Sequence, residues 1–238
     1  VYTVQLERGH IIPPEGGRIE ADGSVFQVLD LTQRPATAKI TLHTSSSLTA
    51  ALSLLDQPPF SFFSKAGQPV NLGDGTAELT ATLSMPLKPK VMLPEVTYVV
   101  TGRIAGFTSP ALVPGRILRA PEVAVAVDTK GLTLSGKGTL DILPVDLTYR
   151  RGFGPDQKGR ARVNGTVILS DAALRDLGIE LPEGAVTGEG PAAIDIALED
   201  GRAPQLTLTS NLAGIGLRLD ALGSVSYTHL TLPTILRV

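Results

Sequence analysis

The stretch that decides the fold is Ala38-Lys39-Ile40-Thr41-Leu42, together with the elements that follow it. Apolar and polar residues alternate there, which predicts a β-strand with one apolar side. A helix-like run follows at 48–55, then Gly73 and Gly75, and then a second alternating stretch at 77–83. The sequence therefore predicts a unit made of a strand, a short helix and a strand.

The same order of elements occurs a second time. An alternating stretch at 161–169 leads into a helical run at 171–177, passes Gly188 and Gly190, and ends in a strand at 193–198. Duplicated units of this kind are typical of repeat architectures, whose neighbouring units extend one surface. A surface used along its length is therefore expected, and not a single catalytic pocket.

Strand signals dominate the rest of the chain, and no long crossover helix separates them, which favours antiparallel pairing. We expect a mostly β fold: a curved antiparallel sheet that forms an open β-groove, built from the repeated unit, with two short helices. Ser47 and Ser170 are the expected N-caps of those helices. The first β-groove repeat is expected at 1–110 and the second, continuous with it, at 111–223.

Two local turns are predicted from glycine-containing stretches. Ala21-Asp22-Gly23-Ser24 contains the Asp-Gly pair of a tight β-hairpin. Gly136-Lys137-Gly138 is expected to turn the chain between one strand through Leu134 and a second through Leu140 and Ile142.

Composition narrows the classes of function. The 238 residues carry a formal net charge of -2, so no electrostatic footprint for nucleic acid is present. There is no cysteine, which removes disulfides and thiolate metal sites. Aromatic residues make up 4% and Trp is absent, which is unusual for a closed sandwich core and natural for a surface that meets hydrocarbon.

No catalytic residue, metal site or cofactor is predicted. The three histidines, His10, His43 and His229, do not have the spacing of metal ligands. Asp195, Glu199 and Asp200 cluster near an expected hairpin, but acid–base catalysis would need one of them in an apolar cleft. We interpret them as exposed turn residues.

An apolar stripe remains as the candidate site. Strands of five to six residues span roughly 17–20 Å, about the length of an extended acyl chain. These alternating apolar residues either line an open groove or form a self-contained core. The sequence does not say which side of each strand would face the groove, because a register slip of one residue reverses the assignment. The groove-lining candidates are Val123, Val125, Val127, Leu132, Leu134, Leu140, Ile142, Val163, Val167, Leu169, Ile194, Ile196, Leu198, Leu206 and Leu208.

The last residues look foreign to the fold. From about Ser224 the chain reads Ser-Val-Ser-Tyr-Thr-His-Leu-Thr-Leu-Pro-Thr, which resembles the translation of a transposase-based sequencing adapter. We therefore expect 224–238 to be a non-native tail.

Several phrases of the sequence resemble the AsmA-like superfamily, specifically its YhdP branch. The similarity covers most of the chain from about Gly17 onward and rests on many weak phrases. They are Leu147-Thr148-Tyr149-Arg150-Arg151-Gly152-Phe153, Arg162-Val163-Asn164-Gly165-Thr166, Leu177-Gly178-Ile179-Glu180-Leu181-Pro182 and Leu206 to Gly214, with Leu54 to Pro58, Gly75 to Glu78 and Met85-Pro86-Leu87 upstream.

The resemblance implies an internal piece of a periplasmic protein of a Gram-negative bacterium, held in the inner membrane by an N-terminal anchor missing here. It implies a segment of a periplasm-spanning lipid-transfer protein, whose apolar groove shelters phospholipid acyl chains between the inner and outer membranes. Outer-membrane or periplasmic proteins are the further partners it suggests.

Two alternatives stay open at this stage. The first is a periplasmic structural or assembly scaffold for outer-membrane biogenesis, whose groove a partner protein closes. The second is an enzyme such as a glycan hydrolase, which would need a polar cleft with converging carboxylates.

Overall fold

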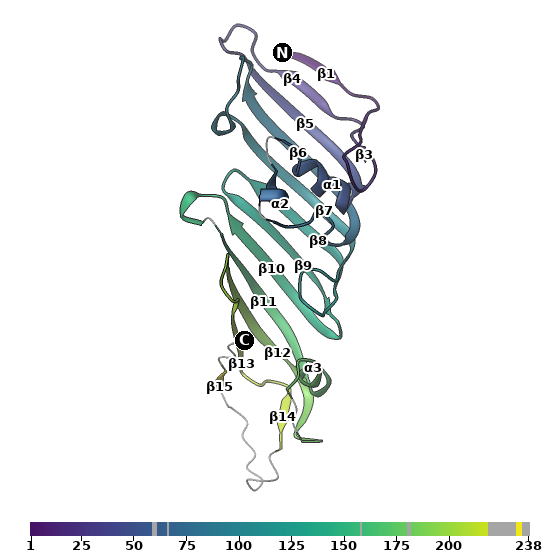
Figure 1. Cartoon of the computed structure of the whole chain (residues 1–238), viewed down its shortest axis with the longest axis vertical. Helices are drawn as coiled ribbons and strands as arrows, with labels where there is room; N and C mark the ends of the chain where they lie inside the picture. Colours follow the sequence, from purple (N-terminus) through teal and green to yellow (C-terminus); the bar gives the residue numbers. More distant parts are fainter. Residues whose placement is uncertain (59–60, 66, 158, 180–181, 219–231, 235–238) are drawn as a thin grey trace. The chain divides into compact units, whose positions relative to one another are not determined.

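A computed structural model describes residues 1–58, 61–65, 67–157, 159–179, 182–218 and 232–234. The described chain is mostly β, with antiparallel strands in an open, curved sheet that does not close into a barrel, as expected (Figure 1). It divides into two compact units, Val1–Leu134 and Ser135–Val238. The expected division into repeats at 1–110 and 111–223 stays a prediction.

The first unit contains eight strands that lie wholly within it. They are β1 (Tyr2–Gln5), β2 (His10–Ile11), β3 (Ile19–Glu20), β4 (Val25–Val28), β5 (Thr37–Ser47), β6 (Asp74–Pro86), β7 (Thr97–Ser109) and β8 (Leu118–Asp128). The main strand order is β1-β4-β5-β6-β7-β8, and these neighbouring strands pair antiparallel. Two helices, α1 (Leu48–Leu55) and α2 (Phe62–Lys65), follow β5, and a 3-10 turn, η1 (Leu93–Glu95), precedes β7.

Helix α1 has the limits and the cap that the sequence predicts. The hydroxyl of Ser47 accepts a hydrogen bond from the backbone N–H of Ala50 at 3.1 Å and donates one to the carbonyl of Gly16 at 2.6 Å. Gly16 is packed so closely on the helix that a Cβ there would lie 2.1 Å from the nitrogen of Ala50. The loop before β3 therefore packs against the start of α1 and is hydrogen-bonded to its cap.

Helix α2 was not expected from the sequence. It begins where the carboxylate of Asp56 accepts hydrogen bonds from the backbone N–H groups of Phe63, at 2.9 Å, and Ser64, at 2.8 Å. The Ser64 hydroxyl also donates to this carboxylate. These bonds lower the pKa of Asp56, with the Ser64 hydroxyl as the largest cause.

The hairpin predicted at Ala21–Ser24 is wrong. Strands β3 and β4 do not pair with each other; both pair with β5, through Glu20↔Ser45 and Val25↔Thr41. The Asp22-Gly23 turn is thus an interruption in one long segment beside β5. Ser24 makes the interruption possible, because its buried hydroxyl accepts a hydrogen bond from the N–H of His43 at 3.1 Å.

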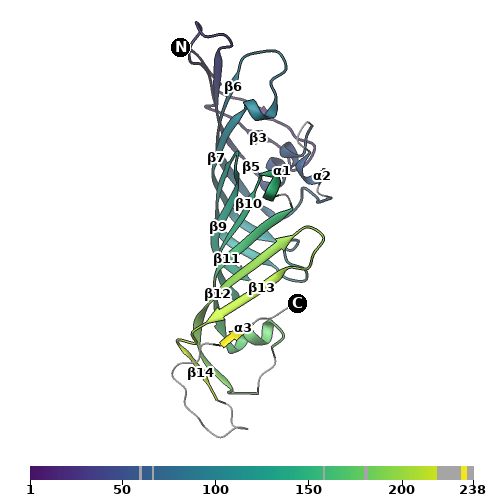
Figure 2. The same ribbon diagram turned by 90° about the vertical axis from the view of Figure 1, so that its left-hand side faces the viewer.

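The second unit repeats this arrangement. Its strands are β10 (Leu143–Gly152), β11 (Arg160–Ser170), β12 (Val186–Glu199), β13 (Gln205–Ser210), β14 (Ile215–Leu217) and β15 (Leu232–Thr234), with the 3-10 turn η2 (Pro155–Gln157) and helix α3 (Asp171–Asp176). The main order is β10-β11-β12-β13-β15, again antiparallel, and β14 pairs with β12. Figure 2 shows α3 at the end of β11.

The two copies match in the strand that leads into a serine-capped helix and in the strand that follows it. Ser47 ends β5 and caps α1, and Ser170 ends β11 and caps α3 by accepting from Ala173 N at 3.2 Å. In each copy a glycine lets a neighbouring backbone come close. A Cβ would lie 2.6 Å from the carbonyl oxygen of Thr108 at Gly73, and 2.2 Å from that of Ala213 at Gly190.

Strand β9 (Gly131–Leu140) spans the boundary between the units. It runs without a break through Gly136 and Gly138, so the turn predicted there is wrong. The chain turns instead at Asp141, whose φ of 52° reverses the direction before β10. Of the expected tail and His229, only Leu232–Thr234 lie among the described residues.

Candidate functional site

One side of the first unit's sheet is apolar. Residues directly opposite each other in an antiparallel pair point to the same side, and the register links Ile40↔Leu83↔Tyr98 and Ala81↔Val100↔Val127. We call this side the first apolar face; its residues are Ile40, Leu42, Ala77, Leu79, Ala81, Leu83, Tyr98, Val100, Ile104, Val123, Val125 and Val127.

The reverse side of the same strands is polar. The neighbours of the apolar residues pair with one another there, as in Lys39↔Ser84 and His43↔Thr80↔Thr101. The ring nitrogen Nδ1 of His43 lies 3.3 Å from the Thr80 hydroxyl, so this histidine belongs to the polar side. The alternation predicted from sequence thus separates the two sides across the sheet.

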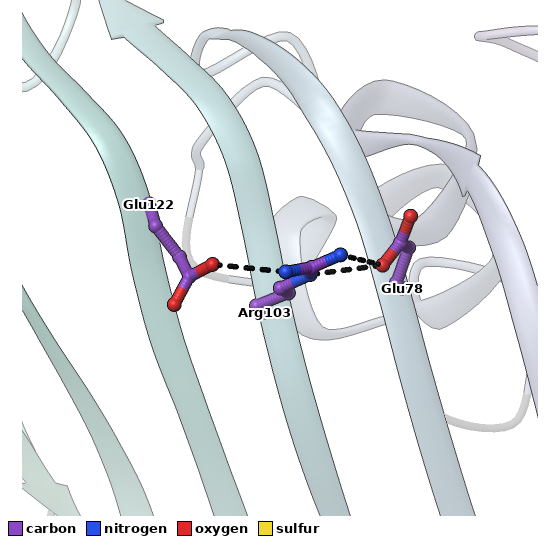
Figure 3. A network of polar contacts seen from close by, with 3 residues as sticks. All are labelled: Glu78, Arg103 and Glu122. Atoms are coloured by element: carbon purple, nitrogen blue, oxygen red, sulfur yellow. Dashed lines mark hydrogen bonds and ion pairs between the residues drawn. The ribbon is translucent and has the colours of Figure 1, made fainter.

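Charged side chains bridge strands on this polar side (Figure 3). Arg103 of β7 donates from Nε to Glu78 Oε2 at 2.9 Å and from Nη1 to Glu122 Oε2 at 3.1 Å. The hydrogen bond to Glu78 is the largest cause of the raised pKa of Arg103. These exposed pairs favour solvent contact on this side while the other side stays free of charge.

Helix α1 covers one end of the first apolar face. Leu48 of α1 is buried in a cluster with Ala77, Ile104, Phe107 and Ala120, against which Ala51 and Leu52 also pack. Figure 1 shows α1 lying over the strands of this unit. This end is therefore the self-contained core that the sequence left open as an alternative.

Between α1 and the opposite end, where Ala38 and Val28 are buried, the apolar side chains are only half-buried. Ile40, Leu42, Leu83, Val100 and Val127 all fall in this class. Tyr98 is half-buried among them, and burial is the largest cause of its raised pKa. Within the described residues of the first unit, this part of the face has no second layer of secondary structure packed on it.

The second unit has an equivalent face. The register links Tyr149↔Val163↔Ile196↔Leu206 on one side, and Ile194↔Leu208 lies beside them. We call this side the second apolar face; its residues are Val145, Leu147, Tyr149, Val163, Val167, Leu169, Ala192, Ile194, Ile196, Leu198, Leu206 and Leu208.

The reverse side of the second unit is polar too. Arg162 of β11 donates from Nε to both carboxylate oxygens of Asp195, each at 2.9 Å. Arg150 donates to the amide oxygen of Asn164 at 2.9 Å.

Helix α3 covers one end of the second apolar face, where it packs on β11 and β12. The residues buried at this contact are Val167, Leu169, Ala192 and Ala173.

The groove-lining candidates fall into four groups. Val123, Val125 and Val127 lie on the first apolar face. Two candidates on the second apolar face, Val167 and Leu169, are buried. The other candidates on that face are Val163, Ile194, Ile196, Leu198, Leu206 and Leu208. Leu132, Leu134 and Leu140 are half-buried at alternate positions of β9. Ile142 lies in the turn before β10 and is 56% exposed.

Sequence reasoning left several members of the faces out of the candidates. The apolar residues of β5, β6 and β7 were not among the groove-lining candidates. The alternation at 38–42 and 77–83 could have identified them, because it is the same signal that selected the candidates on β8. Val145, Leu147 and Tyr149 were also absent. Their alternation with polar residues after Pro144 is visible in the sequence.

The carboxylates considered for acid–base chemistry have other partners. Asp195 lies within β12, not on a turn, and is bound to Arg162. Glu199 ends β12 and accepts from Arg202 at 2.7 Å, with Arg160 at 3.6 Å. In the described part of the chain, no group of three or more such side chains could hold a metal ion.

Among the described residues, no helix is both long and apolar enough to cross a bilayer. No protein-family model, curated protein or solved structure matches this chain.

Proposed function

We propose that this chain is a segment of a lipid-transfer protein whose two apolar faces shelter phospholipid acyl chains. The observation that carries the proposal is the one-sided, half-buried apolar surface of each unit, away from its helix. A periplasmic location, an inner-membrane anchor and movement of lipid between the two membranes follow from the family resemblance and belong to the same proposal.

The size of an apolar face suits an acyl chain. From Leu79 to Met85 in β6, a strand advances about 20 Å at about 3.4 Å per residue. This is about the length of an extended sixteen-carbon chain. A tail lying along the strand direction would therefore stay on apolar side chains throughout.

The energetics favour passage of lipid over permanent storage. Each buried methylene contributes about 0.8 kcal/mol, so full shelter of sixteen carbons contributes roughly 12 kcal/mol. An open face covers about half of the tail's surface and offers roughly half of that value. Because a bilayer shelters the tail fully, a tail on such a face passes readily back into a bilayer.

The side chains of the faces suit a ligand that moves. Valine, leucine, isoleucine and alanine contact hydrocarbon without directional hydrogen bonds, so one position of a tail is little better than the next. The ion pairs on the reverse side keep that side hydrated and define which surface meets lipid.

Photocrosslinking can test the proposal with matched positions on one strand. Benzoylphenylalanine at Val127 would lie on the first apolar face, whereas at Ala126, exposed on the opposite side of β8, it would face water. The purified chain is mixed with phosphatidylglycerol vesicles, irradiated and measured by mass spectrometry. We expect lipid adducts at position 127 and few at 126.

Other results would contradict the proposal. Equal lipid labelling at both positions would mean non-specific association with vesicles. In cells, protein adducts at 127 without lipid adducts would favour the periplasmic scaffold function instead.

A further inference from the structure

The two ends of the second apolar face differ in chemistry. At one end Val167, Leu169 and Ala192 are buried where α3 packs on β11 and β12. At the other end, the half-buried side chains of Tyr149 in β10 and Leu198 in β12 are the last apolar positions of the face before the strands end. One end is therefore covered by a helix, whereas the side chains at the other, which we call the open end, are only half-buried.

A cation follows the apolar residues at the open end. Strand β10 extends to Gly152. Its residues alternate between the two sides, and the series on the apolar side is Val145, Leu147, Tyr149 and Arg151. Strand alternation therefore places Arg151 on the same side as Tyr149. Its neighbour Arg150 lies on the reverse side, where it contacts Asn164.

Among the described cations at this end, Arg151 is the one whose side chain has no partner. Arg160 and Arg202 both contact Glu199, and Arg162 contacts Asp195. Arg151 is exposed and makes no hydrogen bond or ion pair with another described residue. The nearby acids Asp156 and Asp200 are exposed, and within the described part of the chain neither forms an ion pair with Arg151. The guanidinium is therefore available to an anion at the edge of the apolar face.

We propose that Arg151 binds the phosphate of a lipid headgroup, while the acyl tail lies on the second apolar face and points toward α3. This inference rests on the proposed function. A guanidinium offers paired donors that match phosphate oxygens and bind them strongly. The six residues from Arg151 to Val145 span about 20 Å, so one extended tail reaches from the cation to the covered end.

The tyrosine beside the cation fits the same orientation. The ring of Tyr149 can lie on the first methylenes of the tail while its hydroxyl stays hydrated, as tyrosines do where hydrocarbon meets water. The chain would then distinguish a phosphate-bearing lipid from an uncharged lipid that has the same tails.

The test uses the full chain and vesicles of equal parts phosphatidylglycerol and digalactosyldiacylglycerol with identical acyl chains. After incubation the protein is separated from the vesicles, and its bound lipids are quantified by mass spectrometry. The two variants are Arg151→Gln and Arg150→Gln. They remove the same charge from adjacent exposed positions on opposite sides of β10.

We expect the unsubstituted chain to carry phosphatidylglycerol with about tenfold enrichment, the ratio that a charge-assisted hydrogen bond supplies. Arg151→Gln should reduce this ratio to near one while total bound lipid changes less than about twofold, because the tail contacts remain. Arg150→Gln should keep the enrichment.

Retained enrichment in Arg151→Gln, or equal loss in both variants, would overturn the role of Arg151. Lipid bound without any headgroup preference would overturn this inference and leave the proposed function standing. No bound lipid in the unsubstituted chain would overturn both.

Discussion

Val163 in β11 lies directly opposite Ile196 in β12, on the second apolar face. Their chain neighbours Arg162 and Ala197 lie opposite each other on the reverse side. A shift of one residue in this register would bring Arg162 onto the apolar side and Val163 into water. The ion pair between Arg162 and Asp195 favours the observed register, because both charged groups then lie on the same polar side.

The contact of α1 with the first apolar face predicts a large effect of Leu48→Ala on stability. Leu48 is 6% exposed within the cluster that α1 forms with β6, β7 and β8. We expect a loss of about 2–5 kcal/mol in the free energy of unfolding, measured by urea denaturation. Leu55→Ala, at a side chain that is 45% exposed, should cost under about 1 kcal/mol. Equal effects would mean that α1 does not pack as described.

The two helix caps predict unequal effects of the same substitution. Ser170→Ala removes one hydrogen bond, from Ala173 N, and should cost about 1 kcal/mol. Ser47→Ala also removes the bond that its hydroxyl donates to Gly16, so it should cost about 1.5 kcal/mol. Ser47→Thr keeps the hydroxyl and serves as the control. A smaller loss for Ser47→Ala than for Ser170→Ala would contradict the contact between Gly16 and α1.

Close approach of two strands predicts that position 165 accepts only glycine. A Cβ at Gly165 in β11 would lie 1.9 Å from the carbonyl oxygen of Asp146 in β10. We expect Gly165→Ala to lower the free energy of unfolding by about 3 kcal/mol, because backbone must move. Gly154→Ala, where no atom lies within 4 Å of a Cβ, should change it by under about 0.5 kcal/mol. Thermal or urea unfolding would measure both, and a stable Gly165→Ala variant would refute this packing.

Local patterns were sufficient to predict much of the fold. The limits of α1 and its Ser47 cap depend on residues within a few positions of one another, and they are confirmed. The alternation in β11 and β12 likewise identifies their apolar sides. Features that depend on distant partners were missed: the Asp22-Gly23 turn interrupts a strand because Ser24 accepts from His43, nineteen positions away.

The candidate site was predictable in part for the same reason. Alternation locates the apolar positions, but it does not show that α1 and α3 cover one end of each face. It also cannot single out Arg151, because that requires knowing the strand side and which of the neighbouring arginines already have acidic partners. Glu199 contacts two of them: Arg202, which is only three positions away, and Arg160, whose contact becomes visible only when β11 and β12 are paired.

The hydrogen bonds at the start of α2 predict a pH-dependent contribution of Asp56. Its pKa is lowered in the folded chain, chiefly by the Ser64 hydroxyl, so the folded state binds a proton less readily than the unfolded state. The stabilisation is therefore complete above the unfolded pKa of about 3.9 and is lost as the pH falls through the lower folded pKa.

Comparing Asp56→Asn with the unsubstituted chain at pH 7 and pH 2.5 tests this. The urea midpoints should differ at pH 7, and the difference should be smaller at pH 2.5. Asp74→Asn, which removes a carboxylate at an exposed position that starts β6, is the control. A gap of the same size at both pH values would show that the Asp56 carboxylate has no special role.

The open part of the first apolar face predicts a sided effect of a polar substitution on lipid binding. Leu83 and Thr82 are neighbours in β6, but Leu83 pairs with Ile40 on the apolar side and Thr82 with Thr41 on the polar side. An acyl chain on the face would have to desolvate the amide of Leu83→Asn, which costs about 1–2 kcal/mol and weakens binding about tenfold. Thr82→Asn leaves the apolar side unchanged and should bind as the unsubstituted chain does. Because Leu83 is half-buried, urea denaturation must show that both variants stay folded before fluorescent phospholipid is titrated into each. Equal affinity for the two folded variants would mean that hydrocarbon does not lie on this side of β6.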